Sequence, residues 1–398
     1  MRGLGRQVLS RRPKLLYFVT EDWYFCSHRL PLAIAAKEAG YDVTVLTRVQ
    51  AHGEVIKAAG LNLVHFEISR RGVNPLTEVV TIARLVAAYR RLAPDLVHHV
   101  AVKPVIYGSI AARLTRVPGV VNALVGLGWI FTSTSLLARF VRRVVEKAMP
   151  FLLNRGALIV QNPDNAALLL ALGVDKDRIR LIRGSGVDTA TFRPGPEPEG
   201  TPVVLLPARM LWAKGVGEFV DTAGRVRASG IDARFVLVGQ PDPGNPSTVS
   251  HEQLQEWQRE HRVEWWGYHA DMPKVFRQAH IVCLPSYYGE GVPMSLLEAA
   301  STGLPIVTTD VAGCREVVKD GDNGFLIPLR DWVALANALV RLLSDSELRK
   351  RMGARGRERA VSEFDVSSVV SATLAIYQET HVEAFGVGPH ELYRQRPL

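Results

Sequence analysis

The sequence predicts an α/β protein with two domains, each built on a parallel β-sheet covered by helices. Short apolar runs typical of buried strands alternate with helical stretches along most of the chain. This alternation is typical of parallel sheets, whose strands are joined by helical crossovers. The chain has 398 residues, which is enough for two domains of roughly 200 residues, each with its own core.

The first half of the chain contains six predicted strands. They are expected at 14–19, 42–46, 61–66, 95–99, 120–125 and 158–160. Helices are expected between them, for example at 31–39, 76–92 and 166–172. Gly40, Gly60 and Gly173 each follow a predicted helix or apolar segment, and glycine commonly ends a helix at such a position.

A segment rich in Pro and Gly, residues 186–202, separates the two halves and predicts an interdomain linker. Strands are then expected at 203–207, 235–238, 263–266, 281–284 and 306–308, and helices at 332–343, 347–360 and 366–378. We therefore predict a first domain at 13–187, a linker at 188–201 and a second domain at 202–365.

The composition, 47% hydrophobic and 22% charged residues, is that of an ordinary globular protein. Cys26, Cys283 and Cys314 are far apart and show no zinc or disulfide spacing, which favours a reducing compartment. The basic N-terminal stretch lacks the apolar core of a signal peptide. Residues 117–138 are uncharged but rich in Gly, Ser and Thr, so they predict a strand and a loop rather than a transmembrane helix.

The formal net charge of +9 favours an anionic partner. In the segment 136–155, Arg139, Arg142, Arg143 and Lys147 are interleaved with large apolar residues. Such a basic amphipathic helix can lie among the headgroups of an anionic membrane, or its apolar face can pack on its own domain. A nucleic-acid partner is not expected, because the chain has no RNA-binding or helix-turn-helix motif and no basic patch interleaved with aromatic residues.

The segment 279–303 carries the most informative motif. An apolar strand is stopped by Pro285 and Ser286, Glu290 follows in a glycine-flanked loop, and Glu298 comes eight residues later on a predicted helix. Ligands of open α/β sheets bind where strands lead into helix N-termini, which attract anions. Carboxylates at such a place are suited to accept hydrogen bonds from ligand hydroxyls, so we expect a phosphate-bearing sugar. Two glutamates at this spacing also arise by chance, but the surrounding residues favour a site.

A second motif places Arg209 and Lys214 around a predicted turn from strand to helix, with Gly215 opening the helix. Two fixed cations there can hold a diphosphate, although they could also be solvated surface charges. Together with the backbone N–H groups of 291–294, they can stabilise a leaving phosphate without a metal.

No metal site is expected. The two Asp-x-Asp pairs, Asp175 with Asp177 and Asp320 with Asp322, fall in predicted loops or turns.

These motifs resemble the nucleotide-sugar motif of glycosyltransferase family 4, the retaining transferases of the GT-B fold, in which two glutamates are separated by seven residues. The resemblance extends over about 15–377. It implies two Rossmann-like domains facing a central cleft, with a last helix at 366–380 that crosses back to the N-terminal domain.

The resemblance also implies roles for particular residues. Glu290 would lie near the hydroxyls of the donor sugar, Glu298 on the ribose, and Arg209 and Lys214 on the diphosphate. The remaining expected donor contacts are Gly291, Val292, Pro293, Met294, Gly239 and Tyr268. UDP is the commonest nucleotide carrier of the family and is the one expected here, with no further cofactor.

The first domain departs from the family pattern. Its first loop, 20–28, has no glycine, and Val100 or Val102 stands where many members have a histidine. His98 and His99 are either packed in the core or catalytic. The candidate acceptor-side residues are His28, Lys103, Gly126 and Gly128. The stretches that begin at His28 and at Val125, together with the loop 239–247, resemble bacterial transferases that extend sugars on undecaprenyl diphosphate.

The leading hypothesis is a retaining hexosyltransferase. It would move an N-acetylhexosamine or hexose from a UDP-sugar to a polyprenyl-diphosphate-linked saccharide in surface glycan biosynthesis, at the inner face of the plasma membrane. The alternatives are a transferase with a soluble, phospho-sugar or glycerolipid acceptor, a nucleotide-sugar epimerase and, remotely, a nucleic-acid-binding protein.

Overall fold

The structure is a computed structural model that describes residues 11–69, 75–126, 136–287, 289, 291–386 and 388, without the side chains of 75 and 136–141. The chain divides into two compact units. Unit 1 comprises residues 1–182 and 369–398, and unit 2 comprises residues 183–368. The domain boundaries proposed from the sequence stay predictions.

Unit 1 is built on a seven-stranded parallel sheet with the order β3-β2-β1-β4-β5-β6-β7. Its strands are β1 (Lys14–Glu21), β2 (Asp42–Arg48), β3 (Asn62–His65), β4 (Leu96–Val100), β5 (Gly119–Leu124), β6 (Ala157–Val160) and β7 (Ile179–Leu181). Its helices are α1 (Asp22–His28), α2 (Leu30–Glu38), α3 (Gly53–Ala58), α4 (Pro75–Leu92), α5 (Val102–Thr115), α7 (Leu136–Leu153), α8 (Pro163–Ala171), the 3₁₀ turn η1 (Lys176–Arg178) and most of α16 (Val366–Phe385).

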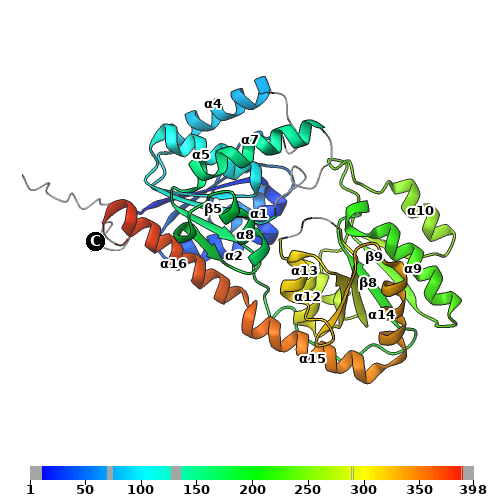
Figure 1. The fold of residues 1–398 in the computed structure, drawn as a ribbon. Coiled ribbons are helices and arrows are strands. Elements are labelled where there is room, and N and C mark those ends of the chain that lie inside the picture. Colours follow the sequence, from blue (N-terminus) through cyan, green and yellow to red (C-terminus); the bar gives the residue numbers. More distant parts are fainter. Residues whose placement is uncertain are drawn as a thin grey trace, which may run out of the picture. The chain divides into compact units, whose positions relative to one another are not determined.

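The two faces of this sheet are covered by different helices. Successive side chains of a strand point to opposite faces, so Tyr17 packs with α1, α2 and α16 while Phe18 packs with α4 and α5. The central strands are buried on both faces, as expected for a parallel sheet between two helical layers. Figure 1 shows helices on either side of the sheet.

Unit 2 is built on a six-stranded parallel sheet with the order β10-β9-β8-β11-β12-β13. Its strands are β8 (Val203–Pro207), β9 (Arg234–Val238), β10 (Glu264–Gly267), β11 (Ile281–Leu284), β12 (Ile306–Thr309) and β13 (Gly324–Ile327). Its helices are η2 (Trp212–Lys214), α9 (Val216–Ala228), α10 (His251–Arg259), α11 (Met272–Phe276), α12 (Met294–Thr302), α13 (Ala312–Val317), α14 (Trp332–Ser344) and α15 (Ser346–Glu363).

The core of unit 2 also has two layers. Val204 and Leu206 of β8 pack with α9 and α14, whereas Val203 and Leu205 pack with α11 and α12. Since β8 is fully buried on both faces, the unit has the doubly covered parallel sheet that the sequence predicts.

The strand order reverses between β1 and β4 in unit 1 and between β8 and β11 in unit 2. At such a topological switch point the following loops leave the sheet in opposite directions, which opens a place for ligands beyond the carboxyl ends of the strands. The motifs with Arg209 and Glu298 follow β8 and β11, so they belong to the switch point of unit 2.

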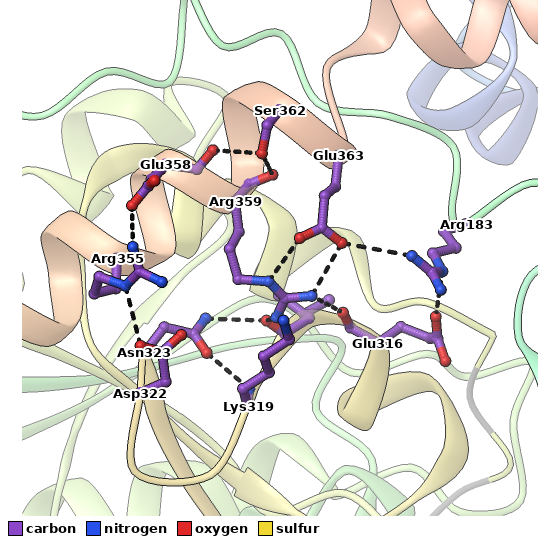
Figure 2. A network of polar contacts seen from close by, with 11 residues as sticks. Arg183, Glu316, Lys319, Asp322, Asn323, Arg355, Glu358, Arg359, Ser362 and Glu363 are labelled. Carbon is purple, nitrogen blue, oxygen red and sulfur yellow. Dashed lines mark hydrogen bonds and ion pairs between the residues drawn. The ribbon is translucent and has the colours of Figure 1, made fainter.

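A polar network holds the first residue of unit 2 to α13 and α15 (Figure 2). Arg183 pairs with Glu316 at 2.9 Å and with Glu363 at 3.5 Å. Arg359 also pairs with Glu363, at 2.9 Å, and donates to the carbonyl oxygens of Val317 at 2.7 Å and Glu316 at 3.1 Å. The guanidinium of Arg359 thereby satisfies carbonyls that the end of α13 leaves without helical partners.

Two features of the fold were not specified from the sequence. Strands β7 and β13 at the sheet edges were not predicted. Helix α16 continues to Phe385, and its residues Ile376 and Tyr377 pack in the core of unit 1. In the described part of the chain, no helix is long and apolar enough to cross a membrane.

The Arg359 contacts predict a site-specific loss of stability. Arg359→Ala should lower the free energy of unfolding of unit 2 by about 2–4 kcal/mol, because it leaves buried carbonyl oxygens without their donor and removes the closer of the two arginine partners of Glu363. Arg355→Ala is the control: Arg355 pairs with Asp322 and Glu358 at the surface, and its loss should cost less than about 1 kcal/mol. Urea unfolding of both variants measures this, and equal losses would contradict the account.

Candidate active site

The candidate site of unit 2 begins with the turn that follows β8. Arg209 lies two residues beyond the strand, and Lys214 ends the 3₁₀ turn η2. Gly215 then adopts a φ of +77°, and a Cβ there would lie 2.2 Å from the carbonyl oxygen of Pro285. Only glycine fits this close approach without strain, so the backbone that carries the two cations lies directly against the loop that follows β11.

Hydrogen bonds fix the same two segments to each other. The amide of Tyr287 donates to the carbonyl of Ala213 at 3.1 Å, and the Ser286 hydroxyl donates to it at 3.2 Å. Thr309, at the end of β12, donates its hydroxyl to the carbonyl of Ser286. The start of the 285–294 loop is thus held in place from two neighbouring strands.

Helix α12 presents its N-terminus at this edge of the sheet. Its N-cap is Pro293, and within the described residues no side chain caps its first turn. The first N–H groups of a helix have no intrahelical acceptor and carry partial positive charge. The predicted donor contacts Gly291, Val292, Pro293 and Met294 therefore lie at the start of a helix suited to an anion.

Glu298 lies on α12, half-buried, one turn beyond Met294. Among the described residues its carboxyl group has no hydrogen-bond partner, and burial raises the pKa of Glu298 to about 8. An acceptor that is desolvated and lacks a protein donor is suited to a ligand hydroxyl, because the new hydrogen bond restores what burial removed.

The loops after β9 and β10 complete the candidate site. Gly239 has a φ of +136°, and a Cβ there would lie 1.9 Å from the carbonyl oxygen of Ala208. Its amide donates to Gly267 at 2.8 Å, and its carbonyl accepts from the Trp265 indole at 2.9 Å. Tyr268, the next residue after β10, is exposed. Gly239 and Tyr268, the positions predicted to contact the nucleotide, thus share one edge of the sheet with the turn that carries Arg209 and Lys214, here called the cation turn.

Glu290, the predicted contact to the donor sugar, lies outside the described residues. Its role therefore stays a prediction.

Both histidines of β4 belong to the core of unit 1. His99 is fully buried, with Nε2 2.9 Å from the Tyr89 hydroxyl and Nδ1 2.7 Å from Asn122 Oδ1, and burial lowers the pKa of His99 to about 4. His98 is also fully buried, with Nδ1 2.5 Å from the Tyr377 hydroxyl. These contacts favour the packed alternative for both histidines.

The described acceptor-side candidates lie in or beside different elements of unit 1. Lys103 donates to Glu78 at 2.9 Å and to the Ser69 carbonyl at 2.7 Å. His28 stacks on Tyr24, with the two ring centroids 4.1 Å apart. Gly126 follows β5 with a φ of +156°, and Gly128 lies outside the described residues. Their roles at an acceptor stay predictions.

The Asp-x-Asp pairs serve local turns. Asp175 accepts from the amide of Asp177 at 3.0 Å, Asp320 accepts from the amide of Leu326 at 2.9 Å, and Asp322 pairs with Arg355. Across the described ranges, no cluster of three or more His, Cys, Asp or Glu residues is arranged to hold a metal ion.

Two family models match the chain. Residues 187–359 match the model described as glycosyl transferases group 1, and residues 14–162 match the model described as glycosyl transferase 4-like. The first match contains the motifs with Arg209, Lys214 and Glu298, and the second spans β1 to β6 of unit 1.

The chain is a glycosyltransferase.

Curated relatives of this glycosyltransferase include two enzymes of lipid-linked glycan assembly. It is 27% identical over 363 residues to the N,N'-diacetylbacillosaminyl-diphospho-undecaprenol alpha-1,3-N-acetylgalactosaminyltransferase of Campylobacter jejuni, covering 88% of this chain and 94% of that protein. It is 27% identical over 323 residues to the UDP-Gal:alpha-D-GlcNAc-diphosphoundecaprenol alpha-1,3-galactosyltransferase of Escherichia coli, covering 77% and 81%.

Solved structures confirm the predicted GT-B fold. Anabaena Alr3699/HepE in complex with UDP and glucose matches with a TM-score of 0.75 at 19% identity, over 92% of this chain and 99% of that one. Sucrose-phosphate synthase of Thermosynechococcus elongatus matches with a TM-score of 0.76 at 22% identity, over the same shares of the two chains.

One residue that contacts a candidate site residue was not singled out in the sequence. Asp242, in the loop after β9, contacts Arg209 Nη1 through Oδ2 at 2.6 Å. Its only sequence signal is its place between two prolines, three residues after Gly239. That pattern predicts a turn but does not indicate which cation the carboxylate faces.

The raised pKa of Glu298 predicts a pH dependence of stability. Between the ordinary pKa of a glutamate, 4.5, and the folded value of about 8, the folded state binds more protons than the unfolded state, so stability falls as pH rises. In Glu298→Gln this loss disappears, and the variant should gain a few degrees in Tm over the wild type between pH 5 and pH 9.

Melting curves across this pH range measure the effect. Glu252→Gln is the matched control: Glu252 is exposed on α10 and its pKa is lowered, so its difference in Tm from the wild type should stay flat. A flat difference for Glu298→Gln as well would contradict the desolvated carboxyl.

Proposed function

We propose that the protein is a retaining glycosyltransferase that moves a hexose or N-acetylhexosamine from a UDP-sugar to a polyprenyl-diphosphate-linked saccharide in surface glycan biosynthesis. The observation that carries this proposal is the switch point of unit 2, where Arg209 and Lys214 share one sheet edge with the start of α12 and with Glu298. Among the residues that the structure describes, no side chain caps this helix start and none bonds to the Glu298 carboxyl group. This set of groups suits a nucleoside diphosphate.

In the proposed reaction, the bond between the anomeric carbon and the diphosphate oxygen breaks, and a bond to the acceptor oxygen forms. Negative charge grows on the leaving phosphate, where Arg209, Lys214 and the first N–H groups of α12 stabilise it. The proton of the acceptor hydroxyl leaves with the diphosphate. Donors fixed before the reaction need no reorganisation while charge develops, and such stabilisation is commonly the largest contribution to catalysis.

Glu298 is proposed to accept hydrogen bonds from the ribose hydroxyls. Ligand hydroxyls favour the ionised carboxylate, so nucleotide binding would lower the raised pKa of Glu298 and release a proton at neutral pH. Glu290 is proposed to bind hydroxyls of the transferred sugar, and the loop around Tyr268 is proposed to face the base.

The proposed acceptor rests on the relatives. Two of them, aligned over 88% and 77% of this chain, are named for acceptors linked to diphospho-undecaprenol. A further relative, the phosphatidyl-myo-inositol mannosyltransferase of Mycobacterium leprae, is 32% identical over 52% of the chain. A glycerolipid acceptor is therefore the second candidate, and a lipid acceptor is common to both.

Helix α7 supplies a surface for such an acceptor. Two of its own residues, Met149 and Leu152, are buried. Three others, Arg143, Lys147 and Phe151, are spaced four residues apart and are exposed along one side of the helix. Arg143 and Lys147 form no ion pair with the described part of the chain. Exposed cations beside an exposed aromatic ring suit an anionic membrane surface.

The proposed membrane surface predicts charge-dependent binding. Arg143→Glu/Lys147→Glu should abolish most of the protein's flotation with vesicles that contain phosphatidylglycerol, because each cation near such a surface contributes about 1 kcal/mol. Arg225→Glu/Arg351→Glu, an equal charge change at exposed positions of unit 2, is the matched control and should float like the wild type. Equal flotation of all three proteins would exclude α7 as the contact.

The proposed activity is tested by incubating the protein and bacterial membranes with a panel of radiolabelled UDP-sugars. Label from one donor should enter the organic-extractable lipid, and Glu290→Ala should reduce its rate on the order of 100-fold or more, as expected when a group that acts on the transition state is lost. Mild acid then separates diphosphate-linked sugar, which is released, from glycerolipid-linked sugar, which is not. Label only in water-soluble products would contradict the lipid acceptor.

A further inference from the structure

We propose that Asp242 is a positioning residue that holds the Arg209 guanidinium where charge develops on the leaving diphosphate. This rests on the proposed function, in which Arg209 contacts that diphosphate. No established property of the chain assigns a role to the loop 240–249, which connects β9 to α10.

In the ion pair of Asp242 with Arg209, Asp242 is the residue with the more fixed position. Asp242 Oδ2 lies 2.6 Å from Arg209 Nη1, and the side chain of Asp242 is 11% exposed whereas that of Arg209 is 39% exposed. The Asp242 amide donates to the Thr248 hydroxyl at 2.9 Å, and the Asp242 carbonyl accepts from the Asn245 amide at 2.7 Å. The backbone of Asp242 is therefore fixed by its own loop, and its short side chain is mostly buried. The longer and more exposed arginine side chain is the partner that gains a defined position.

The same loop also supports the backbone of the cation turn. The amide of Trp212 donates to the Ser247 carbonyl at 2.7 Å, and the amide of Ala213 donates to the Ser247 hydroxyl at 3.0 Å. Val249, which is fully buried in the core, donates its amide to the Met210 carbonyl at 2.8 Å. The loop 240–249 thus holds both the backbone between the two cations and the side chain of one of them.

The chemistry of the pair favours positioning. A guanidinium offers five N–H donors in a rigid fork, so a contact at Nη1 is compatible with diphosphate recognition by other donors of the group. Holding a flexible arginine before the donor binds removes a part of the ordering that would otherwise occur during the reaction. The carboxylate also offsets part of the positive charge of Arg209, which weakens the attraction of Arg209 for the diphosphate. Because this effect opposes the gain from pre-ordering, we expect Asp242 to change the affinity for the diphosphate in the ground state only slightly.

These two effects predict that loss of the Asp242 carboxylate lowers kcat much more than it changes the Kd for UDP. Asp242→Asn should lower kcat on the order of 10- to 100-fold, as expected for a misplaced catalytic contact, while the Kd for UDP changes by less than about threefold. Tm should stay within a few degrees of the wild type. Asp242→Glu, which keeps the carboxylate, should recover a part of the lost kcat.

The matched control is Asp221→Asn. Asp221 also pairs with an arginine, Arg262, at 2.7 Å, but on the exposed surface of the same unit, and kcat, Kd and Tm of this variant should match the wild type. UDP binding is measured by calorimetry, and kcat with the donor that the wild type uses.

The outcomes separate this inference from the proposed function. An active wild type with unchanged kcat in Asp242→Asn overturns the inference alone. Tighter UDP binding with unchanged or higher kcat would also overturn it, because Asp242 would then only compete with the diphosphate. Parallel losses of Tm, UDP binding and kcat, with no recovery in Asp242→Glu, would assign Asp242 a merely structural role. Absence of transfer from every UDP-sugar by the wild type would instead refute the proposed function.

Discussion

The candidate site depends on the contact between the turn after β8 and the loop after β11. These strands are neighbours in the sheet although β9 and β10 separate them in sequence, and Gly215 lets the two backbones meet at a distance that no Cβ would allow. Tyr287 and Ser286 then bond to Ala213. The cation turn and the first residues after β11 are consequently held together as one structure.

Two features at this edge of unit 2 are suited to a ligand. The first turn of α12 has no side-chain cap among the described residues, and the Glu298 carboxyl group is desolvated. Each feature costs stability in the empty protein, and each is relieved by a ligand with an anion near the helix and hydroxyl groups near the glutamate. Elsewhere in the unit, buried groups have protein partners: Arg359 donates to the carbonyl oxygens of Glu316 and Val317 at the C-terminal end of α13.

Much of the fold could be predicted from the sequence, because buried parallel strands are continuous apolar runs. The predictions failed at the edges. In β7, Ile179, Arg180 and Leu181 form a short strand that is not buried, so hydrophobicity does not distinguish it from a loop. β13 begins with a glycine directly after a turn, and its strand conformation is set by pairing with β12. Neither strand has a local pattern strong enough to compete with the turn residues beside it.

The proposed donor-binding residues and the proposed acceptor-binding residues differ in how strongly the sequence encodes them, and the reason is physical. Where backbones approach closely, as at Gly215 and Gly239, only glycine fits, and charges on adjoining turns must keep a fixed spacing, so donor chemistry leaves a readable motif. A surface for a lipid acceptor needs only a suitable mixture of cations and apolar groups, which many sequences supply. His98 and His99, the conspicuous side chains of unit 1, are instead part of its core. The contact of Asp242 with Arg209 is intermediate between a motif that the sequence encodes and a surface that it does not. Its geometry is specific, but from the sequence alone a carboxylate between two prolines predicts only a turn, and the fold is needed to place it beside Arg209.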